Sequence, residues 1–352
     1  MLRVSAAIAR AIDALQERVQ RDEGRRGIGV LVQHGQLLSA ARTLVPPAAA
    51  SASSPSSPPN AAAEGVLILT GFPCLRERTP PIESDGPPGA IAIALTMLAL
   101  SRRPVTVLTE AHSAHVLERC ASAGCIDPGM VPEVAAFPTS DGWGCSDDAR
   151  LDALRSGAST VVSIERAGDS ADGTCYTMRG FPMGPSLLGK INTVAAPGRG
   201  LATIGIGDGG NELGMGSMHA QICEHIPLGP KIGCVVAADA PLVASVSNWG
   251  GYALSCATAL LAWDAGLGLA SGAEAAPEGF LNRLVQDEAM AEATLHACNE
   301  AGAVDGITAE GGGSVDGMPC DVQLGVLADL RRISLEAMRA SPHGASQEQA
   351  GA

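Results

Sequence analysis

Short runs of aliphatic residues alternate with helix-like segments along most of this chain, and no other feature constrains its fold as strongly. Five runs are almost continuously apolar and end in small or polar residues: 66–70, 105–109, 160–164, 202–206 and 234–237. Such runs suit strands that are buried on both faces of a parallel sheet. We therefore predict an α/β fold, a mostly parallel sheet flanked by helices in three Rossmann-like layers. Its ligand site should lie at the carboxyl ends of the strands.

Helical patterns fill the intervals between these strands. The predicted helices are 89–100, 114–123, 147–156, 252–262 and 286–301. A further helix is predicted near the N-terminus, where Ile8, Ile12, Leu15 and Val19 recur at helical spacing. Acids such as Asp13 interrupt this segment, which is atypical of a transit peptide. We therefore expect the helix to pack on the domain.

The chain divides into four parts. Residues 1–45 are predicted to form an N-terminal helical part of the fold, and residues 64–340 the α/β domain. Between them, segment 46–63 is rich in Ser, Pro and Ala, residues that do not build a packed core. We predict a flexible insertion there and a disordered tail at 341–352.

Composition excludes several classes of partner. Aromatic residues make up only 3% of the chain and the net charge is −14, so base stacking and phosphate contacts with nucleic acid are not expected. The ten cysteines contain no C-x-x-C pair, which favours reduced thiols in an intracellular protein over disulfides or zinc. The longest apolar run, 89–100, is shorter than the roughly 20 residues that cross a bilayer. We expect a soluble protein with a small-molecule ligand, no nucleic acid and no membrane partner, and leave open whether it forms a homo-oligomer.

A glycine-rich loop, GIGDGGNELGMG at 205–216, follows one predicted strand. It contains a G-x-G-x-x-G pattern, but Asp208 would place a carboxylate where a dinucleotide's pyrophosphate binds, so we discount a nicotinamide cofactor. We interpret the glycines as allowing a small ligand to approach the backbone closely. The predicted site residues of this loop are Gly207, Asp208, Gly209, Gly210, Asn211 and Glu212.

Other polar residues follow neighbouring strands and should converge on the same edge of the sheet. Asp85 precedes a predicted helix and is expected to cap it, with the adjacent backbone available to a ligand carboxylate. Arginines after a third strand would suit bidentate recognition of carboxylates. The candidate residues outside the glycine-rich loop are Glu83, Asp85, Gly86, Arg166, Arg179, Asp239, Asn248 and Asp305.

Several of these segments together resemble the D-glutamate cyclase domain. They are TGFP at 70–73, ESDGPPGA at 83–90, SIERAGDSADGTCYTMRG at 163–180, IGIGDGGNELGMG at 204–216, SNWGGYAL at 247–254 and VDGIT at 304–308. The resemblance implies a hydro-lyase that converts D-glutamate to 5-oxo-D-proline with loss of water. The resemblance also implies a location in the mitochondrial matrix, because the animal form is mitochondrial, and the alternative location is the cytoplasm. The animal form also carries an additional N-terminal domain. The insertion at 46–63 departs from the family pattern.

Lactam formation needs a base, an oxyanion stabiliser and an acid. We infer Glu212 or Asp208 as the proton shuttle, with Asn211 and the adjacent amides facing the oxyanion. Arg166 and Arg179 would hold substrate carboxylates. The ammonium group, or a magnesium or manganese ion, would be ordered by three acids: Glu83, Asp85 and Asp239. No cofactor is expected to be required, and no spacing of ligands demands a metal.

Two other functions fit the same residues. A magnesium-dependent phosphate-ester hydrolase could use Asp85, Asp208 and Asp239 at three strand ends. A non-catalytic protein could bind an amino acid in the same pocket without turnover.

Overall fold

A computed structural model describes residues 3–342 apart from 46–63, 102, 126, 128, 197, 199 and 270–274. Its centre is a six-stranded parallel sheet in the order β3-β2-β1-β4-β5-β6. The strands are β1 (Gly65–Gly71), β2 (Val105–Glu110), β3 (Glu133–Phe137), β4 (Ala158–Arg166), β5 (Ala202–Gly207) and β6 (Ala240–Val243). The predicted α/β fold with a parallel sheet is thereby confirmed. The predicted insertion at 46–63 and most of the predicted tail, 343–352, lie outside the described residues.

The strand order reverses between β1 and β4. The chain runs from β1 to β3 toward one edge of the sheet, then returns and builds β4 to β6 toward the other. At the end of this central pair, Gly71 of β1 lies opposite Arg166 of β4. In open parallel sheets the loops diverge at such a point and leave a crevice for a ligand.

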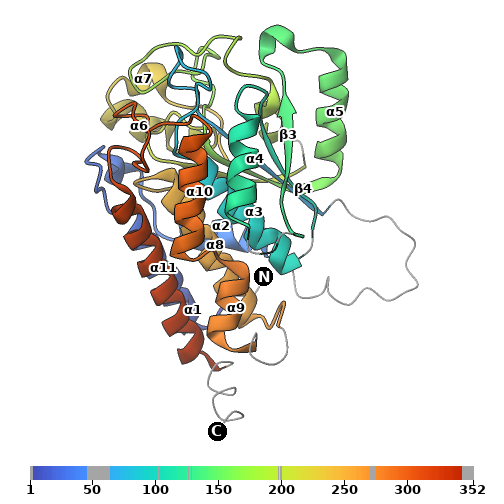
Figure 1. The fold of residues 1–352 in the computed structure, drawn as a ribbon. Coiled ribbons are helices and arrows are strands. Elements are labelled where there is room, and N and C mark those ends of the chain that lie inside the picture. The colour runs from blue at the N-terminus through green and yellow to red at the C-terminus, as the bar shows by residue number, and fades with distance from the viewer. Residues whose placement is uncertain are drawn as a thin grey trace.

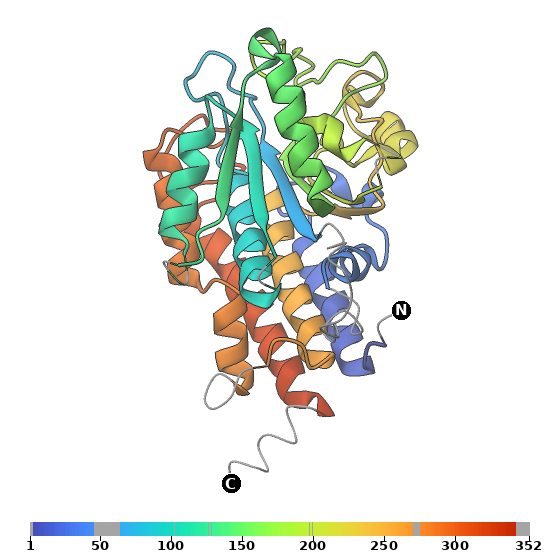
Figure 2. The ribbon, with the colours of Figure 1, turned by 90° about the vertical axis from the view of Figure 1, so that its right-hand side faces the viewer.

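Helices cover both faces of the sheet unequally (Figures 1 and 2). On one face α2, α3, α4 and α8 pack on the strands, and α1, α9, α10 and α11 form a second layer over them. On the other face α5 packs beside irregular segments. The helices are α1 (Ala6–Val19), α2 (Gln36–Leu44), α3 (Pro87–Ser101), α4 (Ala114–Ala123), α5 (Cys145–Ser156), α6 (His219–His225), α7 (Gly229–Ile232), α8 (Ser247–Asp264), α9 (Pro277–Leu284), α10 (Glu288–Glu300) and α11 (Cys320–Ala340).

Burial on both faces explains the continuous apolar runs of the sequence. In β1, Val66 and Ile68 face the larger helical core, whereas Leu67 and Leu69 face the core under α5. The five predicted helices are all present, as α3, α4, α5, α8 and α10, and the predicted N-terminal helix is α1, whose apolar stripe is buried in the larger core. Among the described residues, no helix combines the length and apolarity needed to span a bilayer.

The prediction of a strand at 234–237 is wrong, because that segment pairs with the glycine-rich loop and not with the sheet. The amides of Gly214 and Gly216 both donate to the carbonyl of Val236, and Cys234 donates to the carbonyl of Gly210. The last strand of the sheet, β6, begins instead at Ala240. Strand β3 at the opposite edge and the long amphipathic helix α11 are additions to the predicted set.

Candidate active site

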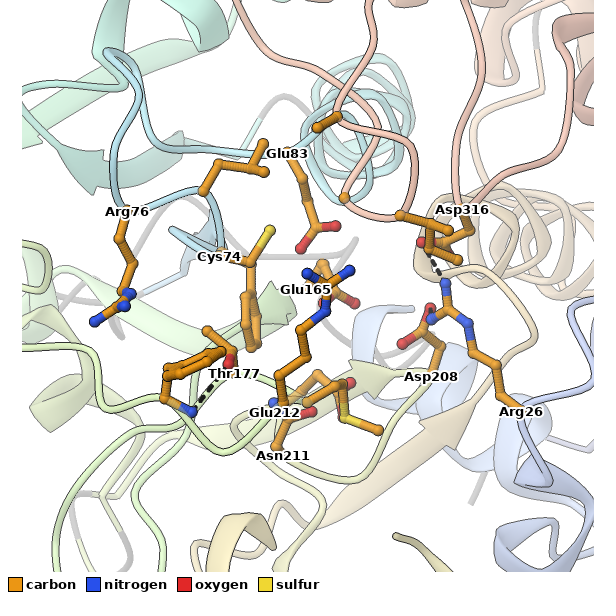
Figure 3. Close-up of a pocket in the computed structure, with 18 of the residues that line it drawn as sticks. Arg26, Cys74, Arg76, Glu83, Glu165, Thr177, Asp208, Asn211, Glu212 and Asp316 are labelled. Atoms are coloured by element: carbon orange, nitrogen blue, oxygen red, sulfur yellow. Dashed lines mark hydrogen bonds and ion pairs between the residues drawn. The ribbon is translucent and has the colours of Figure 1, made fainter. Parts of the chain in front are cut away.

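A cavity of about 700 Å³ opens beyond the carboxyl ends of β1, β4 and β5 (Figure 3). It lies at the predicted edge of the sheet, where the strand order reverses. Its wall carries charges of both signs. The acidic lining residues are Glu77, Glu83, Glu165, Asp208, Glu212 and Asp316, and the basic ones are Arg25, Arg26, Arg76, Arg78 and Arg179.

The carboxylates of the inner wall are buried and crowded. Glu165, Asp208 and Glu212 have exposed fractions of 5%, 3% and 1%. One oxygen from each of these three lies within 4.8 Å of the others, and the same holds for Asp85, Asp208 and Asp316. Asp208 therefore belongs to both groups. Because oxygen ligands at this spacing suit a hard divalent cation, these two groups are the candidate holders of a metal ion.

Burial raises the pKa values of these acids. The pKa of Asp208 rises to about 7, because burial and the nearby Glu212 charge outweigh the lowering effect of Arg26. Burial also raises the pKa values of Glu165, Glu83 and Asp316 well above their usual range, with a smaller contribution from neighbouring carboxylates. A site with acids that change protonation near neutral pH can both accept and donate protons.

Arg26 counters part of this negative charge. Its guanidinium forms an ion pair with Asp208 at 2.5 Å and a second one with Asp316, and its side chain is 19% exposed. The other oxygen of Asp316, Oδ2, is buried without a hydrogen-bond partner. Figure 3 shows Arg26, Asp208 and Asp316 together on one side of the cavity. Burial lowers the pKa of Arg26, but Asp208 and then Asp316 raise it above its usual value, so Arg26 stays charged.

Glu165 reaches the cavity through an unusual backbone conformation at the end of β4. Its φ of 41° lies in the left-handed region, which non-glycine residues rarely adopt. The hydroxyl of Ser247 donates to its Oε2 at 2.6 Å. Gly86 lies against it, since a Cβ there would be 2.8 Å from the Glu165 Cβ. The predicted site residue Gly86 thus makes room for an acid that the sequence analysis did not select.

Arg166 does not line the cavity, and the expectation that it holds a substrate carboxylate is corrected. It is fully buried and pairs with Glu110 at the end of β2 through two N–H groups, each 2.6 Å from a carboxylate oxygen. Its Nε donates to Asn192 at 2.7 Å. Burial alone would raise the pKa of Glu110, but the Arg166 charge holds this pKa below its usual value. The pair has a structural role, because both side chains already have their hydrogen-bond partners within the protein.

Asp239 and Asp305 are also structural. The carboxylate of Asp239 accepts hydrogen bonds from the amide and hydroxyl of Thr203, both at 2.9 Å, near the amino end of β5. It lies at the wrong end of the sheet because it precedes β6 and does not follow a strand. The Asp305 carboxylate accepts amide hydrogens from Ile307, Thr308 and Gly317 and shapes the loop that borders the cavity. Neither side chain lines the cavity.

Asp85 and Asn248 cap each other's helices. The Asp85 carboxylate accepts the amides of Ser247 and Asn248, the first residues of α8, at 2.8 and 2.7 Å. In return, the Asn248 Oδ1 accepts the amides of Gly86 and Gly89 at the start of α3, at 3.0 and 2.8 Å. Asp85 was expected to cap the helix that follows it, and that expectation is corrected. Asn248 likewise acts on a helix terminus and not on a ligand.

The glycine-rich loop uses its amides internally. The amides of Gly209 and Gly210 each donate to the Glu212 carboxylate at 2.7 Å, so they do not face an oxyanion as expected. The Asn211 Nδ2 donates to the carbonyl of Tyr176 at 2.8 Å, and its Oδ1 is buried without a partner. The side chains of Asp208, Asn211 and Glu212 do line the cavity.

Close packing also explains the glycines. Gly214 has a φ of +107°, and a Cβ there would lie 2.6 Å from the Gly205 Cα across the loop. The loop therefore folds back directly on β5, which only glycine permits. Our interpretation of the glycines as space for a ligand, Gly207 included, is replaced by this packing role, since a Cβ on Gly207 would meet the Glu212 side chain at 2.6 Å.

The opposite side of the cavity is basic and apolar. Figure 3 shows Arg76 across the cavity from Arg26. The Arg76 guanidinium lies 5.1 Å from the centre of the Phe181 ring. The Thr177 hydroxyl accepts the Phe181 amide at 3.2 Å, which leaves its own proton for another acceptor. Arg179, a predicted binding residue, lines the cavity and is exposed.

Three charged residues of the inner wall were not predicted from the sequence: Arg26, Glu165 and Asp316. Arg26 offered a weak signal as one of two adjacent arginines, and Glu165 directly precedes the predicted Arg166. Asp316 lies in a loop with a φ of 56° and is preceded by no strand, so no strand-end argument could find it.

Comparison with known proteins gives two findings. A sequence model of a family described as "D-glutamate cyclase-like, C-terminal" matches residues 15–331. A human protein named "D-glutamate cyclase, mitochondrial" is 34% identical to this chain over 272 residues. That match covers 73% of this chain and 40% of the human protein, so the chain spans less than half the length of that relative.

Proposed function

This chain belongs to the D-glutamate cyclase-like family, and on that premise we propose that it cyclises D-glutamate to 5-oxo-D-proline with release of water, as a carbon–oxygen hydro-lyase. The observation that carries the proposal is the group of buried carboxylates around Asp208, which faces a cavity with arginines on its outer side. Such a cavity orients a zwitterion, because the ammonium group is drawn to the acids and the α-carboxylate to Arg179.

Substrate binding follows from the two sides of the cavity. The ammonium group would lie among Asp208, Glu212 and the unpartnered Oδ1 of Asn211, which together offer oxygen acceptors. Arg179 would hold the α-carboxylate. Glutamate must fold back on itself to bring its amine to the γ-carboxyl carbon, and fixing both charged groups selects that conformation.

Asp208 is the proposed base. With a pKa near 7 it is partly ionised at neutral pH and can take a proton from the ammonium group. Glu212 is less suited to this role, since both of its oxygens already accept loop amides. Of the two residues named as candidate proton shuttles, Asp208 is therefore our choice.

The remaining steps use the protonated acids of the inner wall. The free amine attacks the γ-carboxyl carbon, a carbon–nitrogen bond forms, and the Thr177 hydroxyl donates to the developing oxyanion. Glu165, whose raised pKa keeps it protonated, gives one proton to a γ-carboxyl oxygen. The attacking nitrogen passes its second proton to the same oxygen, and the carbon–oxygen bond breaks with release of water. The proton taken up by Asp208 returns to Glu165, so the enzyme ends in its starting state.

No organic cofactor enters this scheme. Nucleophile and electrophile belong to one molecule, and well-oriented intramolecular reactions reach effective molarities of about 10⁵ to 10⁸ M. We therefore propose turnover without ATP or a nicotinamide. A magnesium or manganese ion would be held by Asp85, Asp208 and Asp316 and would polarise a carboxyl oxygen.

The phosphate-ester hydrolase alternative loses its basis in the geometry. It required Asp85, Asp208 and Asp239 together, but Asp239 is bonded to Thr203 at the amino end of β5. A non-catalytic amino-acid-binding protein would use the same cavity, and only turnover distinguishes it from a cyclase.

The test is NMR of the purified chain incubated separately with D-glutamate and L-glutamate in buffer without ATP or nicotinamide. We expect 5-oxo-D-proline to accumulate from D-glutamate and the L-isomer to react at least about tenfold more slowly. Binding of D-glutamate without product would support the non-catalytic alternative. A strict requirement for ATP would indicate an acyl-phosphate route and overturn the mechanism.

A further inference from the structure

The cavity is larger than free glutamate requires. Its volume of about 700 Å³ lies in the range of sites that enclose drug-sized ligands, ~300 to 1,000 Å³, whereas glutamate has only about ten non-hydrogen atoms. The inner wall of carboxylates accounts for the ammonium end of the substrate. Apart from Arg179, the outer part beyond Thr177 has no role in that reaction.

The outer part has a definite chemical character. Met178, Phe181 and Ile307 line it with exposed fractions of 38%, 50% and 53%. They are three of the seven large apolar side chains that are exposed in the described part of the chain, so exposed apolar surface is concentrated at this opening. Such concentration marks a binding surface.

Arg76 adds a positive charge to this apolar surface. Its guanidinium lies over the Phe181 ring, and within the described ranges it has no ion-pair partner. Arg78 lies nearby in sequence and donates to the carbonyl of Ala309 across the opening. In a chain with a net charge of −14, unpaired arginine beside an aromatic ring favours a ligand that carries a carboxylate and some apolar surface.

We infer that the cavity also accepts γ-D-glutamyl amides of amino acids, and that the enzyme releases the amino acid as it forms 5-oxo-D-proline. This rests on the proposed function, because the D-glutamyl part would occupy the inner wall as free D-glutamate does. The γ-carbonyl then points toward the outer part, where the attached amino acid contacts Phe181 and places its carboxylate at Arg76.

The reaction balances without a co-reactant. The α-amine attacks the γ-amide carbon, a ring carbon–nitrogen bond forms, and the original amide carbon–nitrogen bond breaks. Asp208 takes the first proton that the ammonium group loses, and Glu165 gives one to the departing nitrogen. The attacking nitrogen passes its second proton to the same departing group, which leaves as an ammonium ion, and the proton on Asp208 returns to Glu165. An amine leaving group needs protonation even more than hydroxide does, and the carboxyl oxygens of Glu165 and Asp208 lie within 4.8 Å of each other on one wall of the cavity.

The experiment compares three substrates by NMR: D-glutamate, γ-D-glutamylglycine and γ-D-glutamyl methylamide. Each is given to the wild type, to Arg76→Gln and to Arg119→Gln. Arg119 is a matched control, because it is an exposed arginine on α4 that pairs with Glu300 and does not line the cavity. The methylamide has the same reacting bond as the dipeptide but lacks the carboxylate.

We expect the wild type to release glycine and 5-oxo-D-proline, with kcat/KM about fivefold higher for the dipeptide than for the methylamide, the scale of one exposed ion pair. Arg76→Gln should abolish this preference and change D-glutamate cyclisation by less than about twofold, whereas Arg119→Gln should resemble the wild type.

Turnover of D-glutamate but of neither amide would overturn this inference and leave the proposed function standing. Equal effects of both variants on the dipeptide would overturn the role of Arg76, and failure of all three substrates would overturn both proposals.

Discussion

At the scale of single residues, Asp208 lies between two opposed electrostatic influences. Burial and the Glu212 charge raise its pKa, while the Arg26 guanidinium at 2.5 Å lowers it, and the result is about 7. Without Arg26 the carboxyl group would be protonated at neutral pH and could not act as a base. Arg26 is therefore a positioning residue, since it sets the charge of Asp208 and orients it.

Replacing Arg26 should move the pH dependence of the reaction. The wild-type kcat/KM should rise with pH through about 7, because the ionised form of Asp208 is the active one. In Arg26→Gln the positive charge is gone and ionisation of Asp208 becomes harder. We therefore expect the rise of kcat/KM to occur at a pH that is higher by about one unit or more. Arg26→Lys retains the charge and is the matched control. Superimposable profiles for the wild type and Arg26→Gln would contradict this role.

The sequence predicts part of this site because several acids directly follow strands. Asp208 and Glu212 follow β5, and Glu83 lies in the loop after β1. Arg26 is 182 residues from Asp208, and no local pattern reports a contact at that separation. The role expected for Arg166 is wrong for the same reason, since its partner Glu110 comes from β2, which lies on the far side of β1.

At the scale of elements, α3 and α8 begin side by side and exchange caps. Asp85 accepts two amides of α8 and Asn248 accepts two amides from the start of α3. Both helix starts lie beneath the cavity, where Ser247 also contacts Glu165. The exchange therefore fixes two helices that support the inner wall.

Loss of either cap should destabilise the whole fold. Asn248→Ala leaves the amides of Gly86 and Gly89 buried without that acceptor, and we expect a loss of about 2 kcal/mol in the free energy of unfolding. The control is Asp287→Ala, a half-buried cap that serves α10 alone through the amide of Met290, for which about 1 kcal/mol is expected. Urea denaturation measures both. A smaller loss for Asn248→Ala than for Asp287→Ala would contradict the reciprocal arrangement.

The sequence predicts most of these elements because the physical signal is local. Continuous apolar runs locate β1, β2, β4 and β5, each of which is buried on both faces. The segment 234–237 has a similar pattern, but whether an extended segment joins a sheet depends on its distant partner, which here is the glycine-rich loop. Periodicity alone does not identify that partner.

At the scale of the whole molecule, the reversal of strand order brings the ends of β1, β4 and β5 around one cavity. The chain carries a net charge of −14, yet five arginines line this cavity together with its acids. The fold thus places a group of buried acids, with Arg26 among them, and the exposed Arg179 within a single site. This arrangement matches the charges of an amino acid that must bend to react with itself.

The central claim is that the buried acids perform the cyclisation through Asp208. The most direct test follows 5-oxo-D-proline formation from D-glutamate by the wild type, Asp208→Asn and the exposed-acid control Asp141→Asn, with calorimetry for D-glutamate binding and thermal melts for folding. We predict that Asp208→Asn still melts cooperatively and binds D-glutamate but loses turnover by at least about 100-fold, the usual scale for loss of a general base, while Asp141→Asn keeps the wild-type rate. Turnover by Asp208→Asn within about threefold of the wild type would contradict the account.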